Sequence, residues 1–203
     1  MNTPISAPTS VSRSTPSHAE RTQSQRLAFR DALPDIPQAD YDAFAHALVA
    51  NEDLVSCYFE PQVIASGGRC EQILPLEAAL RAGRRAASMS VLLPHERQVA
   101  HLAAFLQPCG LFLCAQASTI EALGIRSLDS RRCTAARYIL LVDAIAVLRR
   151  ANPGLGSTLG AVLQVEGGDD VDPDQVARIA TAARLATLRL NALWTDAVAR
   201  GGV

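Results

Sequence analysis

Two histidines of one predicted helix are the first candidates for metal chemistry. His95 and His101 lie in the stretch 95–106, whose apolar residues recur at helical spacing. Imidazole nitrogens bind metal ions, but two histidines of one helix converge only when three or four positions separate them. Six positions apart, the two rings point about 120° away from each other. A metal site would need ligands from other segments, and we favour the alternative of one cap-region histidine and one half-buried histidine.

Asp143 is the third candidate because it interrupts the apolar run 139–148. An ionised carboxylate in a dry core is costly unless it is paired or bound to a metal. A buried Asp143 would therefore be a further metal ligand beside the two histidines. Alternatively, Asp143 lies near the azimuth of Arg132 and Arg150 and belongs to a narrow solvated stripe of the helix. The sequence leaves both interpretations open.

The cysteines raise two further hypotheses, both centred on Cys109. Cys109 and Cys114 are spaced at the outer limit of a zinc knuckle, but the residues between them are strongly apolar and no second pair follows. A helix start lowers a thiol pKa, so Cys109 with His101 or His95 is a second hypothesis, for a nucleophilic couple. We favour buried, reduced thiols over both. An odd number of cysteines with no apolar leader before them predicts a cytoplasmic protein.

All 19 basic residues are arginines, and the chain has no lysine. The absence of lysine excludes P-loop nucleotide hydrolysis and lysine Schiff-base catalysis. The forked guanidinium group binds phosphate and carboxylate, although solvation of a helix surface is the commoner role of clustered arginines. A formal net charge of −1 argues against a strongly basic nucleic-acid-binding protein. The candidate anion or partner contacts are Arg81, Arg84, Arg85, Arg131 and Arg132.

The remaining pattern predicts an all-α fold with a single domain. Hydrophobic residues make up 49% of the chain, enough to form a core, whereas residues 1–22 are a flexible tail rich in Ser, Thr and Pro. Residues 23–203 form one helical bundle of seven or eight helices, with 128–150 at its centre. No strand alternation is evident, and no apolar run reaches the roughly 18 residues of a membrane span. The clearest helices are predicted at 39–50, 71–92, 95–106, 128–151, 156–165 and 173–199.

The text HERQVAHLAAFLQPCGL at residues 95–111 resembles the central stretch of HD-domain metal phosphohydrolases. In that superfamily a histidine-bearing helix leads to a segment like L-L-H-D-I-G-K. The later helices ARYILLVDAIAVLRR and VARIATAARLATLRLNALW look like the C-terminal part of HD-type domains attached to relaxase or putative helicase proteins of conjugative elements. The resemblance covers about residues 70–200. It places Gln107 and Pro108 where the metal-binding His-Asp pair would stand, which implies a degenerate domain.

The leading functional prediction is therefore a catalytically inactive HD-like helical module. It would act as a binding or accessory domain of a mobile genetic element, with no catalytic residue, metal or cofactor. One alternative is a metal-dependent phosphohydrolase with a non-standard site formed by His95, His101 and Asp143. Another is an arginine-faced regulator that contacts nucleic acid or a protein partner. The sequence indicates no membrane association and does not define an oligomeric state.

Overall fold

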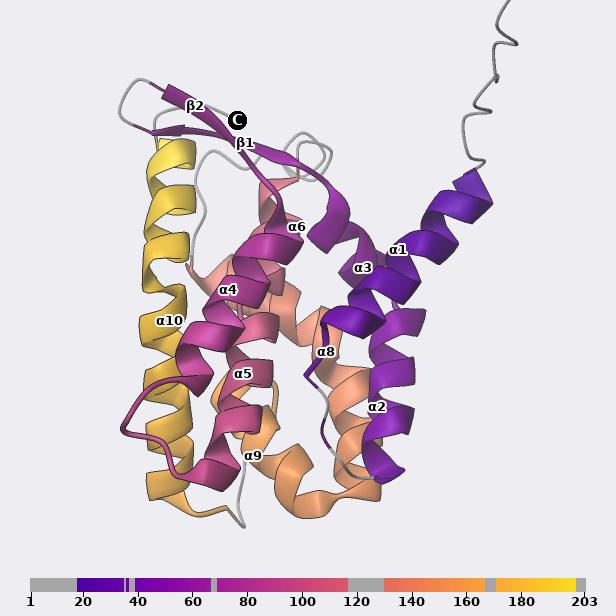
Figure 1. Cartoon of the computed structure of the whole chain (residues 1–203), viewed down its shortest axis with the longest axis vertical. Helices are drawn as coiled ribbons and strands as arrows, with labels where there is room; N and C mark the ends of the chain where they lie inside the picture. The colour runs from indigo at the N-terminus through magenta and orange to yellow at the C-terminus, as the bar shows by residue number, and fades with distance from the viewer. Residues whose placement is uncertain are drawn as a thin grey trace, which may run out of the picture.

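The computed structural model describes residues 18–34, 36, 39–66, 69–116, 130–166 and 171–199. Across these residues the protein is an all-α domain with one short strand pair (Figure 1). The elements, in chain order, are α1 (His18–Ala32), α2 (Ala39–Ala50), α3 (Glu52–Phe59), β1 (Gln62–Ser66), β2 (Arg69–Ile73), α4 (Pro75–Ala87), the 3₁₀ turn η1 (Pro94–Glu96), α5 (Arg97–Leu106), α6 (Cys109–Ala115), α8 (Ser130–Ala151), α9 (Pro153–Leu163) and α10 (Pro173–Ala199).

Side-chain caps set several of these helix boundaries. Asn51 and Asn152 each accept a hydrogen bond of 3.0 Å from the backbone N–H three residues later, at the starts of α3 and α9. Asp172 accepts a hydrogen bond of 3.0 Å from the N–H of Asp174 at the start of α10. Such caps satisfy N–H groups that have no partner within the helix. The predicted end of a helix at residue 151 and the predicted start of the last helix at residue 173 are both confirmed.

The centre of the domain is α5. All five residues from Leu102 to Leu106 are buried, and α5 packs against α4, α9 and α10 (Figure 1). The prediction that 128–150 forms the centre is wrong, because α8 covers one side of the domain and leaves Tyr138 and Ile139 exposed. Apolar residues occur on all sides of α8, but only one side of the helix packs against the core. The small alanines of α5 allow neighbours to approach it from several directions.

The stretch Pro94–Ala115, which contains α5 and α6, is long and apolar enough to cross a membrane by length and composition alone. Within the fold, 78% of its most apolar window is buried. Its side chains therefore pack in the core, as expected for a central helix. No other stretch within the described ranges meets the same criterion.

An aromatic cluster joins α1, α3, α5 and α6 within the core. The ring of Tyr58 stacks on that of Phe105 with a centroid distance of 5.0 Å, and it meets Phe29 and Phe112 edge-on at 5.0 and 5.3 Å. The Tyr58 hydroxyl donates a hydrogen bond of 2.6 Å to the carbonyl oxygen of Phe105. Desolvation of this fully buried phenol raises its pKa well above the usual value. The hydroxyl therefore stays protonated and serves as a donor.

The antiparallel pair β1–β2 corrects the prediction of no strands. The register runs from Gln62 opposite Ile73 to Ser66 opposite Arg69. The helix α3 ends at Phe59, before Pro61, and the β-branched residues that follow favour extended backbone. Each strand has five residues, too few for a clear alternation to show.

The predicted flexible tail of residues 1–22 is wrong for residues 18–22, because α1 begins at His18. Glu20 lies in the first turn, where a carboxylate interacts favourably with the helix dipole. Phe29 anchors α1 in the aromatic cluster. Residues 1–17 of the predicted tail lie outside the described part of the chain.

Two glycines allow the backbone of α8 to touch its neighbours. A Cβ atom on Gly110 of α6 would lie 2.0 Å from the carbonyl oxygen of Cys133, and one on Gly156 of α9 would lie 2.4 Å from the Cα of Arg149. Both distances are shorter than real Cβ atoms tolerate, so these close approaches require glycine. Together the two contacts fix the position of α8 between α6 and α9.

We predict that Gly110→Ala lowers the free energy of unfolding by about 2 kcal/mol, because α6 and α8 must separate to admit the methyl group. Urea denaturation followed by circular dichroism measures the change. Gly154→Ala is the matched control, since its nearest atom would be Asn152 Oδ1 at 3.9 Å. We expect the control to change stability by less than about 0.5 kcal/mol. Equal losses in the two variants would contradict the close approach at Gly110.

Candidate functional site

The structure does not bring the three candidate metal ligands together. His95 is exposed in η1, and Asp143 is exposed on α8, as the solvated-stripe interpretation expects. His101 is half-buried against Gly83 of α4, where desolvation and the nearby Arg84 lower its pKa and keep the ring neutral. Within the described ranges, no three His, Cys, Asp or Glu residues are placed to hold a metal ion.

The positions that the HD-domain resemblance assigns to a metal-binding pair form the turn between α5 and α6. Gln107 ends α5, and Pro108 is buried and precedes the first residue of α6. The carbonyl oxygen of Pro108 accepts a hydrogen bond of 2.9 Å from the N–H of Phe112. This turn thus contributes backbone contacts to the helix junction, and proline has no side-chain ligand for a cation.

Cys109 does not have the properties of a nucleophile. Its side chain is fully buried, and burial raises its thiol pKa to about 12. Cys57 is buried beside it, and desolvation likewise raises the pKa of that thiol. Reactive cysteines need the thiolate and some access to solvent, and neither is available here. The hypothesis of a nucleophilic couple between Cys109 and His101 or His95 is therefore not supported. The prediction of buried thiols is confirmed for Cys57, Cys109 and Cys114, whereas Cys133 is only partly buried.

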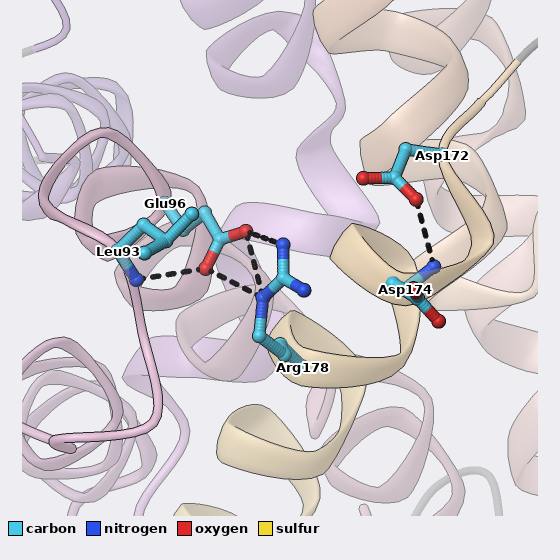
Figure 2. A network of polar contacts seen from close by, with 5 residues as sticks. All are labelled: Leu93, Glu96, Asp172, Asp174 and Arg178. Carbon is cyan, nitrogen blue, oxygen red and sulfur yellow. Dashed lines mark hydrogen bonds and ion pairs between the residues drawn. The ribbon is translucent and has the colours of Figure 1, made fainter.

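An ion pair with a fully buried carboxylate joins Glu96 of η1 to Arg178 of α10 (Figure 2). Arg178 Nη2 donates to Glu96 Oε1 at 2.6 Å, and its Nε lies 3.1 and 3.2 Å from the two carboxylate oxygens. Oε2 also accepts a hydrogen bond of 2.9 Å from the N–H of Leu93. The hydrogen bonds from Arg178 lower the pKa of Glu96, although its side chain is fully buried. The pair therefore fixes the start of α5 against α10.

The five candidate arginines form two separate groups. One group lies on α4, which packs on α5 and α10, and the other lies in the first turn of α8, which packs on α2, α6 and α9. All five side chains are exposed, and Arg81 lies 3.7 Å from Glu77 on its own helix. The structure thus does not join the two groups into one anion site. The α4 group is Arg81, Arg84 and Arg85, and the α8 group is Arg131 and Arg132.

The exposed side of α8 carries two parallel rows of side chains, which we call the α8 face. Successive residues turn by about 100°, so Arg131, Tyr138 and Arg149 lie within about 20° of one another around the helix. Tyr138 is 46% exposed and Ile139 is 70% exposed, which is unusual for side chains of this size. The α8 face is therefore apolar at its middle and basic at both ends. Its second row consists of Arg132, Ile139, the exposed Asp143 and Arg150.

A depression lies at the C-terminal end of the α8 face. It has a volume of about 460 Å³ and is lined by Ala146, Arg149, Arg150 and Glu166. Arg149 Nη1 donates to Glu166 Oε2 at 3.1 Å, and Arg150 Nε donates to the carbonyl oxygen of Ala146 at 3.3 Å. Both guanidinium groups remain partly exposed. An acidic side chain of a partner could therefore contact Arg150 and compete with Glu166 for Arg149.

Comparisons with family models, curated proteins and solved structures find no match for this chain. The HD-domain resemblance of residues 95–111 therefore stays a prediction.

The sequence did not predict the Glu96–Arg178 ion pair, and it predicted the α8 face only in part. The partners Glu96 and Arg178 are 82 positions apart, and no local spacing connects them. The α8 face could be found only in part, because the arginine pairs are visible in the sequence but the exposure of Tyr138 and Ile139 is not. Tertiary packing decides which side of an apolar helix meets the core.

We predict that the buried Glu96 carboxylate makes unfolding depend on pH. Because its pKa in the folded protein is below the usual 4.5, its contribution to stability is present above pH 4.5 and is lost as the pH falls through the lowered value. Urea midpoints measured from pH 6 to pH 3 should therefore decrease for the native chain. Glu96→Gln should have a lower midpoint at pH 6 and a flatter decrease towards pH 3.

Glu52→Gln is the matched control for this measurement. Glu52 also contacts an arginine, Arg26, at 2.6 Å, but its side chain is 75% exposed. Exposed ion pairs contribute little to stability, so this variant should keep both the midpoint and its pH dependence. If Glu96→Gln kept the native urea midpoint and pH dependence, as Glu52→Gln should, the Glu96–Arg178 pair would not stabilise the fold in the way described.

Proposed function

We propose that this chain is a non-hydrolytic helical recognition module that binds a protein segment on its α8 face. The observation that supports this proposal is the exposure of Tyr138 and Ile139 between two pairs of arginines. Exposed apolar side chains with a charged rim are typical of interaction surfaces. Tyrosine and arginine are also enriched at protein interfaces. The partner segment would have an apolar centre and acidic ends.

The dimensions of the α8 face favour a helical or extended partner of moderate length. The arginine pairs are separated by about five helical turns, or roughly 27 Å. An amphipathic segment lying along α8 would place its apolar residues against Tyr138 and Ile139. Carboxylates at its two ends would then reach Arg131 and Arg132 on one side and Arg150 on the other.

A protein segment fits the α8 face better than nucleic acid does. Nucleic-acid surfaces need positive charge along the phosphate backbone, whereas the middle of the α8 face is apolar. Asp143 is exposed in the second row of the face, between Ile139 and Arg150, and would repel phosphate. The formal net charge of −1 also favours a protein partner over nucleic acid.

The proposal includes the degenerate HD-type character that the sequence predicts. It is supported by the neutral, weakly ligating amide of Gln107, the absence of a ligating side chain at Pro108, and the separation of His95, His101 and Asp143. The expectations of a cytoplasmic location and of a mobile-element protein are part of the same proposal. The first rests on cysteine usage and the second on the resemblance.

Selection of a phage-displayed library of 16-residue peptides on the folded chain tests the proposal. We expect enriched sequences with an apolar centre and Asp or Glu at both ends. Fluorescence anisotropy of the best peptide should show at least about tenfold weaker binding to Tyr138→Ser/Ile139→Ser. The control Leu185→Ser/Leu188→Ser removes two apolar residues of α10 that are 46% and 59% exposed, and it should bind normally.

Two results would contradict the proposal. One is a set of selected peptides whose affinity does not distinguish the α8 variant from the α10 control. The other is retention of labelled duplex DNA in 150 mM salt (a concentration of about physiological strength) that is lost in Arg131→Gln/Arg132→Gln but kept in Tyr138→Ser/Ile139→Ser. That second pattern would support the arginine-faced regulator of nucleic acid instead.

The phosphohydrolase alternative makes a separate prediction. If the module is non-hydrolytic, the purified chain supplied with Mn²⁺, Fe²⁺ or Zn²⁺ should not hydrolyse bis-p-nitrophenyl phosphate above the rate of the free metal ion. Metal analysis after gel filtration should give far less than one ion per chain. Stoichiometric metal that is lost in both His101→Ala and Asp143→Ala would establish the non-standard site and overturn the proposal.

A further inference from the structure

The thiols of Cys114 and Cys133 form a hydrogen bond between two helices. Cys114 is in the last turn of α6, and Cys133 is in the first turns of α8. The helices are held together here by the close approach at Gly110, where a Cβ atom would lie 2.0 Å from the carbonyl oxygen of Cys133. The contact between the thiols is therefore fixed by a helix crossing.

Solvent access and charge distinguish this pair from the other described cysteines. Cys133 is partly exposed and Cys114 is buried next to it, whereas Cys57 and Cys109 are both fully buried. Cys57 Sγ lies 3.8 Å from the backbone carbonyl oxygen of Cys109 and 3.1 Å from that of Leu54, so backbone atoms serve as its acceptors. Among the cysteines with described side chains, only this pair combines a thiol partner with one partly exposed member, Cys133.

Two arginines place positive charge beside the thiol pair. The hydrogen bond from Cys133 lowers the pKa of Cys114, and the nearby charge of Arg132 adds to this effect, while burial of the thiol opposes it. Arg137 is buried and interacts with Cys133. Positive charge and a hydrogen-bond donor next to a thiol are the features of cysteines that react with oxidants.

We propose that Cys114 and Cys133 are an oxidation site, which a peroxide converts into a disulfide that links α6 to α8. In the first step, the thiolate of one cysteine attacks an oxygen of hydrogen peroxide and breaks the O–O bond. A sulfenic acid forms, and the departing hydroxide takes up the proton released by the thiol to give water. In the second step, the other thiol attacks the sulfenic sulfur, the S–S bond forms and a second water leaves. Two thiols are oxidised by two electrons, and one peroxide is reduced to two waters.

The disulfide would restrict the unfolded chain and stabilise the junction of α6 and α8. It closes a ring of about 20 residues between two helices that already touch, so the native geometry needs little adjustment. It also fixes the turn of α8 that carries Arg131 and Arg132.

Peptide mapping of the full chain tests the proposal directly. The reduced protein is treated with a small excess of hydrogen peroxide, alkylated without reductant and digested with trypsin. We expect peptide 98–126 joined to peptide 133–137, about 2 Da lighter than the two reduced peptides together, with fragmentation placing the bond at Cys114. The thermal midpoint should rise by about 5 °C or more and return after treatment with dithiothreitol.

Cys114→Ser and Cys133→Ser should each lose both the linked peptides and the thermal shift, while the matched control Cys57→Ala should retain them. The map of the native chain needs no variant, so a variant that fails to fold leaves the test valid. Disulfide-linked dimers, a bond from either cysteine to Cys70 or Cys109, or overoxidation of Cys133 with Cys114 still reduced would each overturn the proposal.

Discussion

The backbone contacts of α8 with α6 and α9 are the constraint on which the functional features of this domain depend. Gly110 and Gly156 let the three helices meet without side chains between them, and this sets the rotation of α8 about its own axis. Leu141, Ile145 and Leu148 consequently face the core, while Tyr138 and Ile139 face outward. The same crossing places the thiol of Cys133 against that of Cys114. The α8 face and the thiol pair therefore share one structural origin.

Much of the helical framework could be predicted from local chemistry. Asn152 and Pro153 separate α8 from α9 because one caps a helix start and the other fits only its first turn. Asp172 marks the start of α10 in the same way. These signals involve residues within one turn of each other, so they do not depend on the rest of the fold. The six-residue spacing likewise indicates that His95 and His101 diverge, and the structure places one in solvent and the other against α4.

Contacts between distant segments could not be predicted. Asp143 lies in an apolar run that is compatible with either a buried or an exposed carboxylate. Only the packing of α8 against its neighbours determines that the Asp143 side chain is exposed. The central position of α5 was missed because alanine gives a weak signal of burial, whereas a helix rich in alanine can pack closely on several neighbours. The pairing of Cys114 with Cys133 depends on Gly110, whose role as a contact point becomes visible only when α6 and α8 are placed side by side.

The Glu96–Arg178 pair makes α10 an integral part of the domain. A chain that ended before α10 would keep Glu96 at the start of α5 but would remove the guanidinium that compensates its charge. The start of α5 would then have to rearrange or take up a proton. The most central helix and the last one described are thus expected to open as one cooperative unit in hydrogen exchange, even though about 80 residues separate them in sequence.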